Sequence, residues 1–425
     1  MLASKGLPAK GRAQALGPQL SKGSTAMGRV HAQKLAAYWL TSVGSLAMQY
    51  SFSVIFVDLL VAFDSTRAAT AAVGSLSAGL MDGFGVISGR AIARRGEVAC
   101  GSLGALLSGL GLIASSQCQT LWQLYVTYGV MLGVGQSLGL YSGVIACNKW
   151  FPENTALASG FANSGAGVGP FAIPFLWAAL KRETNGWRGA LAALGAMVFA
   201  VLFAGALGLA PPPPSSEKRA PVSPIAVSAV PGVRRLMRTT FIFGFGFWIP
   251  AVHIVRYGLD RDLSRRRAES LLLYLGAGAL TMRVPVGALA DRCGRSRVYS
   301  ATCLTYAVAL ALTPVWQRSY EGLAVFSFLC GSCIGSLLSL SATLVVDVAE
   351  VSDPDALARA SGLICAFLGI GGTLGPVIAG AFYDAYETYL PGFYFGAGAL
   401  ALAAISVHVE AAEQPTDVVV SNHVV

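Results

Sequence analysis

Long apolar runs separated by short polar segments dominate the chain. An α-helix needs roughly 20 apolar residues to cross a bilayer, and the runs are close to that length. There are twelve of them, at residues 35–57, 69–89, 98–115, 120–146, 156–180, 188–209, 239–255, 268–290, 298–314, 321–346, 360–382 and 391–409. The pattern predicts an all-α membrane protein with twelve transmembrane helices.

A polar segment divides these runs into two groups of six. It contains Pro211 to Pro214, which cannot continue a helix, followed by polar and basic residues. The expected domains are a basic N-terminal tail (1–34), a six-helix bundle (35–209), a cytosolic linker (210–238), a second six-helix bundle (239–409) and a C-terminal tail (410–425). The run at 239–255 is short and rich in Gly and Phe, so we expect a broken helix there.

Composition agrees with a membrane protein. Hydrophobic residues make up 54% of the chain and charged residues 12%, with a mean hydropathy of +0.61. Soluble domains carry roughly 25% charged residues, so this chain has too few to cover two water-facing domains. Glycine accounts for 50 of 425 residues, and small residues let transmembrane helices pack closely.

The basic residues predict the orientation. With an even number of spans, 19 of the 30 Lys and Arg residues fall on the side of the termini and 10 on the other side. Basic residues favour the cytosolic side, so both termini and the linker are expected there, and the net charge of +9 does not indicate nucleic-acid binding. On the opposite side, Arg265 to Arg267 are interpreted as a solvated loop rather than as a funnel for anions. Residues 1–34 contain no acidic residue, which fits the cytosolic tail that we favour or an organellar transit peptide.

The two halves contain a repeated sequence. Gly89-Arg-Ala-Ile-Ala-Arg-Arg-Gly96 recurs 198 residues later as Gly287-Ala-Leu-Ala-Asp-Arg-Cys-Gly294. A second pair consists of Ala158-Ser-Gly160 with Gly169-Pro170, and Ala360-Ser-Gly362 with Gly375-Pro376. A duplication in the same order predicts two parallel halves around a central axis, an architecture found in solute transporters.

Other chemistries have little support in the sequence. Cys330-Gly-Ser-Cys333 has C-x-x-C spacing without nearby zinc partners, and the chain has four His. The glycine clusters Gly165–Gly169 and Gly369–Gly375 lie inside apolar runs, where close helix packing explains them better than nucleotide binding. Since we find neither a Walker lysine motif nor a nucleophile–base set, we expect no enzyme, no cofactor and no metal.

The second copy of the repeat resembles the signature loop of the major facilitator superfamily. The matching string is Gly287-x-x-x-Asp291-Arg292-x-Gly294-Arg295, and in that family the loop follows the second span and recurs after the eighth. The resemblance implies that these residues form inner gating loops: Gly89, Arg94, Gly96, Gly287, Asp291, Arg292 and Gly294. Ala93 replaces the Asp in the first copy, so its gate is expected to be weaker or to use another carboxylate.

Further strings resemble the monocarboxylate porters of that superfamily. They are Tyr50-Ser-Phe52 with Leu59–Arg67, Asn148–Pro152 with Ala156–Gly160 and Gly165–Gly169, Asn185–Arg188, and His253–Asp260 with Ala268–Leu273 and Arg283–Gly287. Nearly the whole chain is covered. The resemblance implies a carrier that moves a small organic anion by rocking two halves about a central site.

Three departures from the porter pattern concern the transport chemistry. No Lys occurs between Leu35 and Val57, where the family is thought to pair its anion. Ala279 stands one turn before Arg283, where an Asp is common, and Glu153-Asn154 replaces basic residues of the fifth-span motif. The family's proton relay therefore cannot simply be carried over to this chain, although its eighth-span Arg does match, at Arg283.

Two charges fall inside predicted spans. Asp82 and Arg283 would each cost about 2.5–3.5 kcal/mol at a helix centre, so such groups usually face a cavity or a partner. We expect Arg283 to bind substrate and Asp82 to couple a proton, because the resemblance places both spans at the cavity; the alternative is a structural ion pair. Tyr50 is a candidate hydrogen-bond donor to substrate, and Asp58 and Asp64 are interpreted as solvated span ends.

The sequence thus predicts a transporter of a small organic anion, with a monocarboxylate favoured, that works by alternating access. The lipid bilayer and the anion are the expected partners, with or without a proton, and nucleic acid is not. The alternatives are a non-transporting sensor with the same fold and a carrier of a different small solute. We expect the plasma membrane as its location, with an organellar membrane as the alternative. The need for an ancillary membrane protein, the direction of transport and the oligomeric state are left open.

Overall fold

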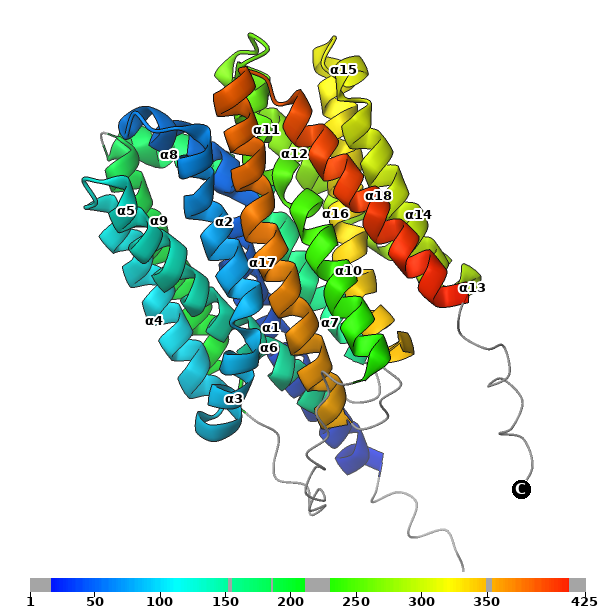
Figure 1. Ribbon diagram of the computed structural model, residues 1–425. Coiled ribbons are helices and arrows are strands. Elements are labelled where there is room, and N and C mark those ends of the chain that lie inside the picture. Colours follow the sequence, from blue (N-terminus) through cyan, green and yellow to red (C-terminus); the bar gives the residue numbers. More distant parts are fainter. Residues whose placement is uncertain (1–16, 152–154, 185, 211–229, 349–353, 413–425) are drawn as a thin grey trace, which may run out of the picture.

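The computed structural model describes residues 17–151, 155–184, 186–210, 230–348 and 354–412, and every regular element in these residues is a helix. The elements are shown in Figure 1 and are α1 (Gly17–Ala62), α2 (Arg67–Gly83), α3 (Gly85–Arg95), α4 (Glu97–Ser116), α5 (Leu121–Leu124), the π-helix η1 (Tyr125–Leu132), α6 (Gly133–Trp150), α7 (Thr155–Asn163), the 3-10 helix η2 (Ser164–Gly167), α8 (Val168–Glu183), α9 (Trp187–Leu207), α10 (Pro231–Phe247), α11 (Ile249–Leu259), α12 (Arg265–Thr281), α13 (Arg283–Cys293), α14 (Arg295–Ala311), α15 (Thr313–Trp316), α16 (Tyr320–Val348), α17 (Pro354–Tyr386) and α18 (Leu390–Ala412).

All twelve apolar runs are helical, and their order is as predicted. In the described part of the chain, nine continuous spans are long and apolar enough to cross a membrane, or ten if the bent pair α2–α3 counts as one. The other two runs are the interrupted series α7–η2–α8 and the 17-residue α14, which packs against α16 and α18. Both runs belong to the same bundles as their neighbours, although α14 is short and the α7–η2–α8 series is interrupted.

Some expected boundaries differ from the observed helix ends. Helix α1 begins at Gly17, so part of the basic tail continues directly into the first span, and α10 begins at Pro231 inside the expected linker. Residues 1–16, Glu153-Asn154, the proline run at 211–214 and residues 413–425 lie outside the described residues. The division into domains at the stated residues therefore stays a prediction.

The helices form two bundles that lie side by side. In Figure 1, α1 to α9 occupy the blue-to-green half and α10 to α18 the green-to-red half. The bundles meet where α2 packs along α17, where α1 packs against α11, and where α8 packs against α12. This arrangement brings together the inner part of α1 around Tyr50, the start of α8 and the end of α12.

The sequence repeat is also a structural repeat. Helices α2 and α12 each have 17 residues, and the helices that follow them, α3 and α13, each have 11. Helices α3 and α13 each end at a glycine with positive φ, which is 84° at Gly96 and 93° at Gly294. Residues with a Cβ rarely adopt this conformation. The two glycines of the repeat therefore form equivalent turns in the two halves.

The interruption expected near 239–255 is present, but it is one residue long and the span stays continuous from Pro231 to Leu259. Helix α10 ends at Phe247 and α11 begins at Ile249, with Trp248 between them. Pro250 lacks the amide hydrogen that a continuous helix would use at this point, which explains the break. The Trp248 ring lies edge-on to Tyr50 of α1, with ring centroids 5.2 Å apart, so the break faces the other bundle.

Candidate functional site

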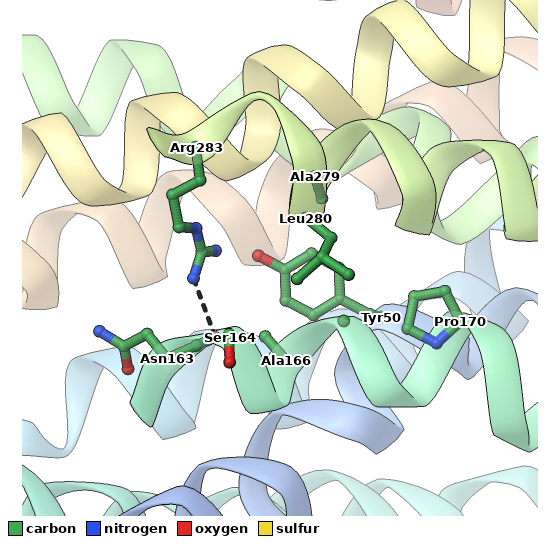
Figure 2. Close-up of a pocket in the computed structure, with 9 residues that line it drawn as sticks. Tyr50, Asn163, Ser164, Ala166, Pro170, Ala279, Leu280 and Arg283 are labelled. Carbon is green, nitrogen blue, oxygen red and sulfur yellow. Dashed lines mark hydrogen bonds between the residues drawn. The ribbon is translucent and has the colours of Figure 1, made fainter. Parts of the chain in front are cut away.

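A narrow cavity lies between the two bundles, with a free volume of about 10 Å³, room for about one water molecule. Figure 2 shows most of its lining, which comes from α1, from the series α7–η2–α8 and from the α12–α13 bend: Tyr50, Asn163, Ser164, Ala166, Gly167, Pro170, Ala279, Leu280 and Arg283. Because both halves contribute residues, a movement of one bundle against the other changes the cavity.

Two glycines hold α8 and η2 against α1. A Cβ at Gly165 would lie 3.0 Å from the Trp39 carbonyl oxygen, and one at Gly169 would lie 2.5 Å from the Cα of Ala47. No larger residue fits without moving the helix backbone. The prediction that this glycine cluster serves helix packing is confirmed, and the close packing brings η2 beside Tyr50.

Arg283 connects the two bundles. It is the first residue of α13, directly after the bend at Met282. Its Nη1 donates to the Asn163 carbonyl oxygen in the first bundle at 2.9 Å, and its Nε donates to the Gly335 carbonyl oxygen of α16 at 3.2 Å. A guanidinium has five N–H donors, so donors remain for a ligand in the cavity.

The hydroxyl of Tyr50 points toward the guanidinium of Arg283 (Figure 2). Tyr50 is 1% exposed, and its hydroxyl has no hydrogen-bond partner among the described residues. An unpaired buried hydroxyl costs about 1–3 kcal/mol, a cost that a polar ligand would remove. The structure thus brings together two of the residues that the sequence suggested for substrate binding.

Asp82 lies elsewhere, in the last turn of α2, and does not line the cavity. Its carboxylate lies near Cys365 of α17, and the Tyr141 hydroxyl donates to its backbone carbonyl oxygen at 3.4 Å. In the part of the chain that is described, no basic side chain forms an ion pair with it. The alternative of an Asp82–Arg283 pair is not observed, because Arg283 bonds to backbone carbonyls.

The glycines of the gating loops are loosely packed in the part of the chain that the structure describes. A Cβ at Gly89 or Gly287 would meet no atom within 4 Å. Asp291 is 68% exposed and lies 3.5 Å from Arg295, one turn away in its own half. The acid that directly follows the first copy in the sequence is Glu97, which binds Lys149 within the same bundle. The gating role of Gly89, Arg94, Gly96, Gly287, Asp291, Arg292 and Gly294 stays a prediction.

The sequence analysis missed one contact of the site and misread another residue. The Asn163 carbonyl that accepts from Arg283 lies where α7 changes to the 3-10 helix η2, and no local pattern indicates this contact. Asp58 was interpreted as a solvated span end, which is wrong. Its carboxylate accepts from Trp177 at 2.6 Å, from Lys181 at 2.7 Å and from Arg265 at 2.9 Å.

Comparison with known proteins gives the family. The family model described as Major Facilitator Superfamily matches residues 38–284 and 239–419. The MFS-type transporter pynF of Aspergillus niger is 27% identical over 84% of this chain and 83% of its own length. Monocarboxylate transporter 3 of Rattus norvegicus is 28% identical over 83% and 74%, and human monocarboxylate transporter 11 is 26% identical over 86% and 79%.

Solved structures show the same fold at lower identity. The nucleoside transporter NupG superposes with a TM-score of 0.70 and 14% identity, covering 89% of this chain and 99% of NupG. The E. coli fucose:proton symporter FucP gives a TM-score of 0.60 and 13% identity, covering 89% and 98%. The family model, which matches most of the chain, shows that the chain belongs to the major facilitator superfamily and is a multi-pass integral membrane transporter of a small solute, not an enzyme.

Proposed function

We propose that this transporter carries a small organic anion, a monocarboxylate, in the cavity between the bundles. The observation that carries the proposal is that the Tyr50 hydroxyl, which has no hydrogen-bond partner among the described residues, points toward the Arg283 guanidinium. Of the nine lining residues, all in the described part of the chain, Arg283 is the one with a charge. An intramembrane cation at a cavity is usually a functional group, and its ligand is expected to be an anion.

The rest of the lining suggests the form of the anion. Ala166, Pro170, Ala279 and Leu280 offer an apolar wall next to the guanidinium. A carboxylate can accept from the remaining Arg283 donors and from the Tyr50 hydroxyl, while a short apolar group contacts this wall. A second carboxylate would have no cation in the lining, so a monocarboxylate fits better than a dicarboxylate. The names of the relatives from rat and human point the same way.

The geometry also suggests how binding is linked to movement. Arg283 donates to Asn163 across the bundle interface, and a bound carboxylate would compete with that carbonyl for the same guanidinium. Charged acceptors form stronger hydrogen bonds than neutral carbonyls. Substrate binding would therefore weaken one contact between the halves, as alternating access requires. We expect this to occur in the plasma membrane, with an organellar membrane as the alternative.

A substrate panel tests the proposal. Purified protein in proteoliposomes is expected to take up short monocarboxylates such as butyrate and lactate with saturation, and to take up succinate and the uncharged amide butyramide poorly. Radiolabelled uptake with mutual competition measures this. Equal uptake of butyrate and butyramide would contradict an anion site, and binding of butyrate without any uptake would favour the sensor alternative.

We propose further that Asp82 carries a proton with the anion. No basic side chain forms an ion pair with Asp82 among the described residues, so its carboxylate is available to bind and release a proton during the cycle. In wild type, an inward proton gradient is expected to increase butyrate uptake several-fold, and Asp82→Asn should lose that response because its amide cannot titrate. Uptake at several imposed pH gradients measures it.

The matched control is Asp64→Asn, which changes an exposed acid between α1 and α2. It should keep the wild-type response. If wild-type uptake ignores the gradient, or if Asp82→Asn retains the full response, Asp82 does not couple a proton and the carrier works as a uniporter or exchanger.

A further inference from the structure

Two arginines occupy equivalent positions in the two halves. Arg67 is the first residue of α2 and Arg265 the first residue of α12, and they are separated by the 198 residues of the repeat. Each follows a hydroxyl residue, Thr66 or Ser264, whose side chain caps its helix. Each arginine also binds an aspartate of the opposite bundle: Arg67 binds Asp260 at the end of α11, and Arg265 binds Asp58 in the last turns of α1. These two cross-bundle contacts are called the outer ion pairs below.

The Arg67–Asp260 pair is the better shielded of the two. The Arg67 side chain is 8% exposed, and its guanidinium bonds both carboxylate oxygens of Asp260, one of them at 3.0 Å. The guanidinium also lies over the Tyr383 ring, 3.2 Å from its centroid. Bidentate geometry and ring stacking are properties of arginine that lysine does not share.

A third acid reinforces this contact. The carboxylate of Asp384, in the last turn of α17, accepts from the backbone N–H groups of Arg67 and Ala68, each at 2.9 Å. A carboxylate at a helix N-terminus is stabilised by the free N–H groups and by the helix dipole. The first turn of α2 is therefore held to the second bundle through both its side chain and its backbone.

The Arg265–Asp58 pair is more open to solvent. The Arg265 side chain is 43% exposed and also bonds Glu269 at 2.8 Å, one turn away in α12. Asp58 is shared with Lys181 and Trp177 of its own bundle. Exposed ion pairs contribute less than shielded ones, so this pair is expected to be the weaker one.

Both pairs lie at the end where α1 joins α2 and α11 joins α12, the upper end in Figure 1. The distribution of basic residues assigns this end to the outer side of the membrane. At the opposite end, the ion pair of Asp291 in the gating loop is with Arg295 of its own half.

We propose that the outer ion pairs form the outer gate of this carrier. They hold the two bundles together at the outer end. Both pairs must break before the cavity opens outward, when the four charged groups become hydrated. The reciprocal arrangement lets each half supply one arginine and one aspartate, so the gate follows from the same duplication as the inner gating loops. The proposal rests on the fold and not on the identity of the substrate.

Access to a cysteine in the cavity tests the gate. Ala279→Cys supplies the reporter, in a background with Cys293→Ser to remove an exposed cysteine. An impermeant maleimide is applied to intact cells and, separately, to inside-out vesicles. In the double variant Arg67→Gln, Arg265→Gln, labelling from the outside should become roughly fivefold to tenfold faster and labelling from the inside slower, because removing the pairs favours the outward-open state.

Arg266→Gln is the matched control, since it removes an exposed charge one residue from Arg265 and should leave both rates unchanged. Arg265→Gln alone, at the more exposed site, should give a smaller change in the same direction. This single variant keeps the test valid if the double variant does not fold. Unchanged outside labelling in the double variant would overturn the proposal. An equal increase from both sides would overturn it too, because that result indicates general loosening of the bundles.

Discussion

Replacing Arg283 with Lys is expected to remove most butyrate uptake while the protein still reaches its membrane. Arg283 donates hydrogen bonds to two backbone carbonyl oxygens on different bundles, those of Gly335 and Asn163. Its remaining N–H groups can donate to a ligand in the cavity. A lysine has one ammonium on a flexible chain and cannot reproduce that planar geometry. Loss of one charge-assisted hydrogen bond costs about 1.5–3 kcal/mol, so uptake efficiency should fall by roughly tenfold or more.

Initial uptake rates, normalised to the amount of protein in the membrane, measure this effect. Arg266→Lys is the control and should transport normally, since its side chain is exposed at the start of α12. Tyr50→Phe should mainly raise the KM, because it removes a hydroxyl that has no other partner among the described residues. Normal kinetics in Arg283→Lys would mean that Arg283 is structural.

The second large effect is expected for Gly79→Val, where the two bundles touch. A Cβ at Gly79 of α2 would lie 2.6 Å from the carbonyl oxygen of Gly369 in α17, so the helix backbones are in direct contact. Valine would force the bundles apart, and overpacking of this kind costs about 1–3 kcal/mol. We expect a lower midpoint of thermal unfolding and loss of most transport, measured on the purified protein and by uptake in proteoliposomes.

Gly398→Val provides the matched control, because a Cβ at Gly398 would meet no atom within 4 Å. It adds the same side chain to a helix of the second bundle and should change neither property by much. Wild-type unfolding and uptake in Gly79→Val would show that the close α2–α17 crossing is not required for the transport cycle.

The length of the apolar runs was sufficient to predict the helices. Each span must form its backbone hydrogen bonds within its own helix and must be long enough to cross the bilayer. The repeat predicted equivalent structures in both halves, and the turns at Gly96 and Gly294 confirm this through their positive φ. The chain also revealed Arg283 as a candidate, since a charge inside an apolar run is costly without a function. These properties depend on local sequence, which explains why they could be read without the structure.

Contacts between the bundles could not be predicted in the same way. The approach of Tyr50 to Arg283 and the ion pair of Asp58 with Arg265 join residues that are far apart in the sequence. An ion pair between Asp82 and Arg283 was an alternative because both are charges inside apolar runs. In the structure Arg283 instead donates to backbone carbonyl oxygens. Periodicity determines which residues belong to a helix, but the relative placement of two rigid bundles determines which side chains meet between them. The tertiary structure alone therefore decided the cavity and the outer ion pairs.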